Sequence, residues 1–361
     1  MDKLNKAREQ IDIIDKEMAT LFEKRMQAVK EVAEYKIEHA LPVFDKERED
    51  KILQSCTSKL FDQTLAEYYV DYVKNLMRVS KNYQNKIMGN IKIAYSGTEG
   101  AFGYLAAKEL YPNAEYVAYP HFAGAYKAVE EGQVDCAVLP IENSVAGDVG
   151  TVMDLTFNGN LYINRVIDLN VNHCLLGVKG ASKQDIKRVV SHAQALEQCD
   201  QFIKENGFLT TDYVNTALAA KYVLEQNDKS LGAIASKESA ETLGLTVLEQ
   251  NVNNDKNNTT RFAVFSRAQA VPSKEAKNNN EHFIIVFTTK NQAGTLATAL
   301  NIIGAHNFNM RNLRSRPLKD LMWNYYFFIE ADGNVNSYEG QNMLKELSAV
   351  CAKLKLVGTY K

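Results

Sequence analysis

The stretch LNKAREQIDIIDKEMATLFEKRMQAVKEVAEY, residues 4–35, places apolar side chains at heptad spacing. These positions are Leu4, Ala7, Ile11, Ile14, Met18, Leu21, Ala28, Val32 and Tyr35. The first glycine of the chain is Gly89, and Pro42 is the only proline before it, so helix-breaking residues are nearly absent. The pattern predicts one long helix that ends before Pro42.

Two further helices are expected in this glycine-free region. The second should begin near Asp45, and the third should run from about Leu65 to Met88, within an all-α domain at residues 1–88. One long helix and two shorter ones bury little apolar surface alone. We therefore expect the chain to pair with a second copy, as a homodimer or a higher homo-oligomer.

Cationic side chains interrupt the apolar seam of the first helix. Arg25 occupies a position where the heptad calls for an apolar residue, and Lys36 returns to within about 20° of it, about 16 Å along the axis. Together they would bracket a small dianion; the alternative is an interhelical salt bridge. Arg8 lies about 25 Å from Arg25 along the rod, so an antiparallel partner helix would have to supply its own Arg8.

Two polar groups follow at helical spacing. Asp45, Arg48 and Glu49 share one face at the start of the second helix, and Ser80 and Gln84 are an i, i+4 pair on the third. Ser80 or Gln84 could equally be a solvated surface residue.

Taken together, these residues resemble the site of the helical chorismate mutase domain of bifunctional P-proteins. The resemblance implies that Arg8 and Arg25 bind carboxylates, Lys36 and Gln84 face the ether oxygen of chorismate, Asp45 and Glu49 hold its ring hydroxyl, and Arg48 and Ser80 complete the pocket. It also implies a dimer in which Arg8 comes from the other chain. The pericyclic rearrangement to prephenate needs preorganised donors and no covalent catalyst.

From Ile91 the sequence changes to short β-rich runs separated by helical or turn-rich stretches. The runs are IKIAY, CAVLP, HCLLGV, RVVSH, LGAIAS and RFAVFS. This alternation is typical of an α/β domain, here at residues 90–268. Polar residues follow several runs: the GTEG loop at 97–100, Glu142 and Asn143, Ser191 with Gln198, and Thr260 with Arg261. Each group alone also fits loop capping.

In their order, the PIENS, SHAQALEQC and TRF motifs resemble those of prephenate dehydratase. The resemblance implies two α/β lobes with prephenate in the cleft between them. Thr260 would donate to the departing hydroxyl, Arg261 would fix a carboxylate, and Glu142, Asn143, Ser191 and Gln198 would line the cleft. Departures from the family pattern occur at Thr98, Ala101, Gly103 and Ala193.

The polar segment 271–281 is typical of a linker, and residues 282–361 show a βαββαβ order of an α+β module. This module resembles the ACT regulatory domain, which implies a phenylalanine site between two such domains. Its residues would be Gly294, Thr295, Leu296, Arg314 and Ser315. Arg314 reverses the charge of the family's glutamate. We expect Trp323, the only tryptophan, to report phenylalanine binding by fluorescence.

Composition narrows the class of protein. Among 361 residues, 42 Lys and Arg face 44 Asp and Glu, which argues against a nucleic-acid partner bound by bulk charge. The charged N-terminus lacks the pattern of a secretory signal, and no stretch approaches 18 uncharged apolar residues, so we expect no membrane span. Five scattered cysteines favour a reducing cytoplasm. We expect no cofactor and no metal.

The expected function is a cytoplasmic bifunctional enzyme that converts chorismate to prephenate and then to phenylpyruvate, inhibited by phenylalanine. One alternative is a chorismate mutase whose middle domain regulates without catalysing. Another is a two-lobed small-molecule binding protein fused to a helical dimerisation arm. An assay of chorismate loss and phenylpyruvate formation separates the three.

Overall fold

The computed structural model describes residues 2–39, 41–270, 281–318 and 324–361. Most of the expected linker and Trp323 lie outside the described residues. The chain divides into two compact units: Met1–Ile91 with Asn113–Glu115, and Lys92–Pro112 with Tyr116–Lys361. In the described ranges, no helix is both long and apolar enough to cross a membrane.

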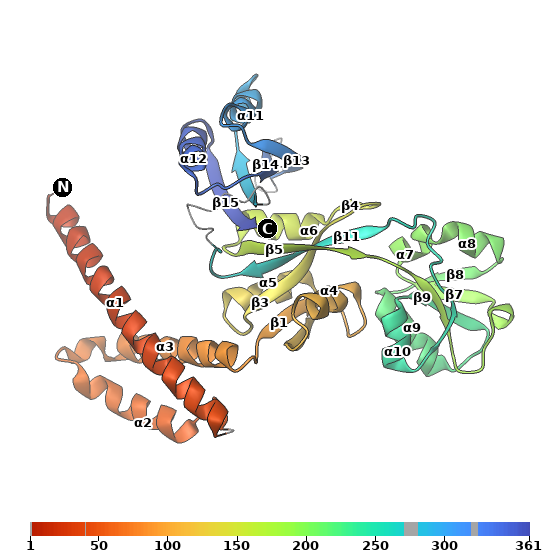
Figure 1. Cartoon of the computed structure of the whole chain (residues 1–361), viewed down its shortest axis with the longest axis horizontal. Coiled ribbons are helices and arrows are strands. Elements are labelled where there is room, and N and C mark those ends of the chain that lie inside the picture. The colour runs from red at the N-terminus through yellow and green to blue at the C-terminus, as the bar shows by residue number, and fades with distance from the viewer. Residues whose placement is uncertain (1, 40, 271–280, 319–323) are drawn as a thin grey trace. The chain divides into compact units, whose positions relative to one another are not determined.

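The first unit is helical, as predicted. It contains α1 (Asp2–Glu38), α2 (Lys46–Cys56) and α3 (Ala66–Ile87), with single 3-10 turns at Thr57–Lys59 and Gln63–Leu65. Both α1 and α2 pack on α3, and a small core forms around Cys56, Val73 and Met77 (Figure 1). Much of the α1 seam remains exposed, Leu4, Ile11 and Leu21 by more than half.

The second unit begins with a mixed α/β lobe. Its strands are β1 (Lys92–Ser96), β2 (Glu115–Tyr119), β3 (Cys136–Asn143), β4 (Gly147–Asp148), β5 (Tyr162–Asn170) and β11 (Thr259–Ser266). Its helices are α4 (Phe102–Leu110), α5 (Phe122–Glu130) and α6 (Gly150–Asn158). The central strand β3 runs parallel to β1 and antiparallel to β11. It is buried over most of its length, as its apolar run predicts.

The chain then crosses to a second lobe and returns, so the predicted two-lobed architecture is confirmed (Figure 1). The second sheet has the order β10-β6-β9-β7-β8. Its strands are β6 (Cys174–Gly177), β7 (Arg188–Ser191), β8 (Leu209–Asp212), β9 (Leu231–Ala235) and β10 (Thr246–Glu249). Its helices are α7 (Ala193–Gln198), α8 (Asp200–Glu205), α9 (Thr216–Gln226) and α10 (Lys237–Leu243), with a 3-10 turn at Lys183–Asp185.

The last part of the chain has the predicted βαββαβ order. Its elements are β12 (His282–Thr288), α11 (Thr295–Ala305), β13 (Asn309–Pro317), β14 (Tyr325–Asp332), α12 (Tyr338–Val350) and β15 (Lys353–Tyr360). Helices α11 and α12 cover one face of this sheet, through a core that includes Phe283, Ile285 and Ile329. The opposite face shares a core with the first lobe, to which Ile284 and Phe328 belong.

This C-terminal module is joined to the first lobe more closely than a linked domain would be. Strand β15 pairs with β5 at Gly358 and Ile163, which makes one continuous ten-stranded sheet. A Cβ at Gly358 would lie 1.9 Å from the Ile163 carbonyl oxygen, so only glycine permits this close approach.

Candidate active sites

The first candidate site lies in the helical unit, where α1 packs on α3. The Arg25 guanidinium donates to the Ser80 hydroxyl, which donates onward to the Leu76 carbonyl at 2.7 Å. One turn further along α3, Gln84 is also buried, and within the described ranges its Oε1 atom has no hydrogen-bond partner. A half-buried cation and a buried amide with an unused acceptor are suited to a polar ligand.

Three other predicted residues of this site have partners within the chain. Lys36 donates to the Val43 carbonyl at 2.7 Å, which holds its ammonium at the end of α1. Asp45 caps α2 by accepting from the Arg48 backbone N–H at 3.0 Å. Glu49 pairs with Lys81 of α3 at 2.9 Å.

The lysine that pairs with Glu49, Lys81, was missed by sequence reasoning. The sequence does indicate this residue, because Lys81 directly follows Ser80 in α3 and therefore lies beside the helix face that Ser80 and Gln84 share. Its ammonium also lies 5.3 Å from the centre of the Phe44 ring.

Arg8 does not join this group within one chain. It is exposed, about 25 Å along α1 from Arg25. Arg48 is exposed as well. Within a single chain, the structure therefore assembles a site around Arg25, Ser80 and Gln84, while Arg8 is exposed elsewhere on α1.

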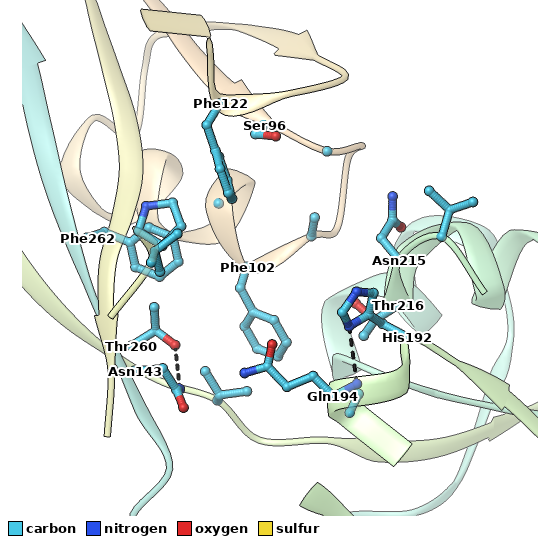
Figure 2. A pocket seen from close by; sticks show the side chains of 18 of the residues that line it. Ser96, Phe102, Phe122, Asn143, His192, Gln194, Asn215, Thr216, Thr260 and Phe262 are labelled. Atoms are coloured by element: carbon cyan, nitrogen blue, oxygen red, sulfur yellow. Dashed lines mark hydrogen bonds between the residues drawn. The ribbon is translucent and has the colours of Figure 1, made fainter. Parts of the chain in front are cut away.

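The second candidate site is a cavity of about 760 Å³ lined by both lobes of the second unit. Figure 2 shows the Phe102, Phe122 and Phe262 rings in it, opposite polar residues of the second lobe. Its polar lining consists of Ser96, His121, Asn143, Thr151, His173, His192, Gln194, Gln198, Asn215, Thr216 and Thr260. The lining contains no Asp, Glu, Lys or Arg among the described residues. An apolar cavity with neutral hydrogen-bonding groups is a typical small-molecule site.

Asn143 and Thr260 lie side by side on β3 and β11 (Figure 2), and the hydrogen bonds of Asn143 determine which of the two residues donates to the other. The Asn143 Oδ1 atom accepts from the backbone N–H groups of Val145 (3.1 Å) and Ala146 (2.8 Å). Its Nδ2 must therefore be the donor to Thr260 Oγ1, at 2.9 Å. Because Thr260 accepts this bond, its own O–H proton remains available for a ligand.

Gln198 is oriented by a buried histidine. The Gln198 Oε1 atom lies 3.1 Å from His173 Nε2, and burial lowers the pKa of His173 to about 4. A neutral His173 therefore carries its proton on Nε2 and donates to Gln198. This leaves the Gln198 amide N–H groups for the cavity.

Three residues predicted to bind substrate do not line the cavity, and the prediction for them is corrected. Ser191 is fully buried and donates to the Ile234 carbonyl at 2.5 Å. Glu142 and Arg261 point to the other face of the sheet, because alternate residues of a strand face opposite sides. Asn143 and Thr260 are next to them in sequence and therefore face the cavity.

Several cavity residues were missed by sequence reasoning. Asn215 caps α9 through its side chain at 2.7 Å, so Asn-Thr before an apolar helical pattern was an available signal. Of the GTEG loop, Gly97 lines the cavity with a φ of +108°, whereas Gly100 packs against Ser239. No sequence signal distinguishes the aromatic rings of the cavity from core residues.

The residues predicted for a phenylalanine site are divided between two faces of the C-terminal sheet. A bulge in β13 places Ser315 opposite Phe327, on the face that α11 covers together with Leu296. Gly294 begins α11 with a φ of +83°, and the Thr295 hydroxyl donates to the Lys290 carbonyl at 2.7 Å.

Arg314 belongs to the opposite face. It lies opposite Phe328 and forms ion pairs with Glu142 and Asp148 of the first lobe. Within one chain Arg314 therefore lies on the other face of the sheet from these four residues, and its place in a site between two modules stays a prediction.

Comparisons with known proteins match both of the regions that carry a candidate site. The family model for prephenate dehydratase matches residues 93–270, and that for chorismate mutase type II matches residues 7–85. Arogenate dehydratase 2 of Petunia hybrida is 34% identical over 75% of this chain and 71% of its own length. The structure of a prephenate dehydratase from Arthrobacter aurescens in complex with L-Phe matches with a TM-score of 0.69 and 25% identity, over 75% of this chain and 89% of its own.

A relative of the full length carries both domains. The bifunctional chorismate mutase/prephenate dehydratase of Enterobacter agglomerans is 31% identical over 98% of this chain and 94% of its own length. Since both family models match and this relative aligns over nearly the whole chain, the chain belongs to the bifunctional chorismate mutase/prephenate dehydratase family.

Proposed function

We propose that this chain catalyses two consecutive reactions of phenylalanine biosynthesis. The helical unit rearranges chorismate to prephenate, and the cavity of the second unit converts prephenate to phenylpyruvate. The observation that carries the second activity is the hydrogen-bond chain from Ala146 through Asn143 to Thr260, which leaves the Thr260 proton free in an apolar cavity.

In the dehydratase reaction, the bond from the ring to its carboxylate breaks and CO₂ leaves. Its electron pair moves into the ring as the ring hydroxyl departs. Thr260 donates a hydrogen bond to the departing oxygen, where negative charge develops. The Phe102 and Phe262 rings favour loss of the carboxylate by excluding water, while Gln198 offers its amide N–H groups to the substrate.

In the mutase reaction, the chain supplies donors that are in place before substrate binds. Arg25, held by Ser80, binds a carboxylate, and Lys36 together with the Nε2 amide of Gln84 donates to the ether oxygen, where negative charge develops. Asp45 and Glu49 hold the ring hydroxyl through carboxylate lone pairs that their partners Arg48 and Lys81 do not occupy.

The mutase site is completed by Arg8 of a second copy. Support comes from the exposed seam of α1 and from the distance of about 25 Å between Arg8 and Arg25 along one helix. The test mixes Arg8→Ala and Arg25→Ala chains, each inactive alone. A shared site predicts roughly one quarter of wild-type mutase activity in a 1:1 mixture, because half the dimers are mixed and each has one intact site of two. No recovery on mixing refutes the shared site.

The overall assay supplies chorismate and follows its loss together with phenylpyruvate formation by ultraviolet absorbance. Both signals are expected from wild-type protein. Loss without phenylpyruvate would indicate a regulatory middle domain, and neither signal would indicate a binding protein. Thr260→Ala should lower phenylpyruvate formation by about 10²-fold or more while sparing the mutase.

Phenylalanine is the proposed inhibitor, acting through the C-terminal module as an ACT domain. Support comes from the βαββαβ order of the module and from the related Arthrobacter aurescens prephenate dehydratase, whose structure is a complex with L-Phe. Gly294, Thr295, Leu296 and Ser315 are the residues proposed to contact it, at an interface between two modules. Titration calorimetry tests binding, and an unchanged dehydratase rate in saturating phenylalanine would refute inhibition. The five free cysteines support a cytoplasmic location as part of the proposal.

A further inference from the structure

The two strands that carry the dehydratase residues also carry charges on their opposite face. In the antiparallel pair of β3 and β11, Thr260 lies opposite Asn143, and the next pair is Arg261 opposite Glu142. On its other side, Arg261 lies opposite Asp168 of β5. One residue pair therefore faces the cavity, and its immediate neighbours face the C-terminal module.

Arg261 is held mainly by one carboxylate of that module. Its Nη1 atom donates to Glu330 Oε2 at 2.8 Å and its Nη2 atom to Glu330 Oε1 at 3.0 Å, a two-pronged pair. The contacts of Arg261 with Glu142 (3.5 Å) and Asp168 (3.4 Å) are longer. Glu330 thus determines where the guanidinium lies.

Glu330 is deeply buried, with an exposed fraction of 1%, yet it is ionised. Burial would raise its pKa, but hydrogen bonds from Arg261 and from the Tyr360 hydroxyl hold the pKa below the ordinary value. A buried carboxylate is costly unless it is paired. Its presence at this place, rather than an apolar side chain, indicates that the pair has a positioning role.

The backbone around this pair is rigidly connected. Tyr360 ends β15, the strand that joins β5 in the shared sheet, and Glu330 lies in β14 of the same sheet. Arg314 of β13 adds a second connection by pairing with Glu142 on β3. Residues of the C-terminal module therefore hold both β3 and β11 through ion pairs. These pairs lie next to Asn143 and Thr260, which face the cavity.

We propose that Glu330 is a positioning residue of the dehydratase, acting through Arg261 to fix Thr260. The C-terminal module is then part of the dehydratase machinery itself, in addition to any role in sensing. This inference rests on the proposed dehydratase activity. Loss of the pair would let Thr260 move, and a displacement of about 1 Å can lower the rate on the order of 10²-fold. We therefore expect the effect on kcat.

The test measures phenylpyruvate formation from prephenate by the full-length Glu330→Gln protein. We expect kcat to fall about tenfold or more. The KM for prephenate should stay within about twofold, because the Thr260 donor stabilises the transition state more than the bound substrate. The mutase rate should be unchanged. Glu346→Gln is the matched control, since Glu346 is an exposed carboxylate of the same module that pairs with His306.

A wild-type kcat in Glu330→Gln would overturn the inference, as would a fall in kcat matched by an equal fall in the mutase rate. If Glu330→Gln does not fold, Tyr360→Phe decides, because it removes only the hydroxyl that donates to Glu330. A severalfold loss of kcat at unchanged KM supports the inference, and an unchanged kcat overturns it. Wild-type protein that makes no phenylpyruvate would refute the proposed activity instead.

Discussion

Asn143→Asp is expected to switch off the dehydratase while preserving its fold. The replacement is nearly isosteric, and one carboxylate oxygen still accepts from the Val145 and Ala146 N–H groups. The other takes the place of Nδ2, beside Asn258 Oδ1 (2.8 Å) and Thr260 Oγ1 (2.9 Å). Asn258 can flip to meet it, because its Nδ2 atom is without a partner in the described ranges. Thr260 then turns its proton toward the carboxylate and away from the substrate.

The variant loses one hydrogen-bond donor at the oxygen where negative charge develops. We expect kcat to fall about 10² to 10³-fold, which corresponds to about 3 to 4 kcal/mol in activation free energy. Repulsion of the anionic substrate adds an increase in KM. The assay is phenylpyruvate formation from prephenate, with the mutase rate as an internal control for folding.

A double variant sharpens this test. If the carboxylate acts by capturing the Thr260 proton, Asn143→Asp combined with Thr260→Ala should lose little more kcat than Thr260→Ala alone. Multiplied losses in the double variant would refute the reasoning, and so would Asn143→Asp with more than a tenth of the wild-type kcat.

Burial, close backbone approach and charge each give one more testable expectation. Burial lowers the pKa of His173 to about 4, so the unfolded chain binds more protons than the folded one from about pH 6.5 down to 4, and stability falls across this range. His173→Gln should remove up to about 3 kcal/mol of this pH-dependent loss in the free energy of unfolding, measured by urea denaturation at several pH values. A pH dependence equal to that of the wild type would contradict the prediction. Gly358→Val should separate β15 from β5 and lower the melting temperature, whereas Gly304→Ala, with open space around its Cβ, should not. Lys36→Met should lower the mutase rate by about 10²-fold without affecting the dehydratase, whereas Lys30→Met on the exposed side of α1 should leave both rates unchanged.

The pattern of apolar residues and the positions of glycine, proline and turn-rich stretches were sufficient to predict the apolar and amphipathic helices and strands. The three helices of the first unit and the buried strands β1, β3, β6, β7, β9 and β11 follow from this pattern. Strand β8, Leu209–Asp212, was missed because all four residues are exposed and offer no apolar run. Strand β5 was missed because its residues alternate less regularly than the sequence rule assumes.

The sequence predicted which types of residue form the site, but not in every case which face of the sheet their side chains point to. Strand alternation alone shows that Glu142 and Asn143 cannot both face the cavity, and likewise Thr260 and Arg261. Choosing the cavity-facing member requires the far face to be known, and on that face Arg261 pairs with Glu330, which is 69 residues away in sequence. The direction of Arg314 also depends on the bulge near Arg311, which no local sequence signal marks.

The charge of Arg314 is explained by its surroundings within the chain. Its guanidinium meets Glu142 and Asp148, two carboxylates that lie opposite each other on β3 and β4. Burial already raises the pKa of Asp148, and Arg314 counteracts this. A glutamate at this position would place three carboxylates together, each disfavouring the others' charge. The cation is therefore a requirement of the contact between module and lobe.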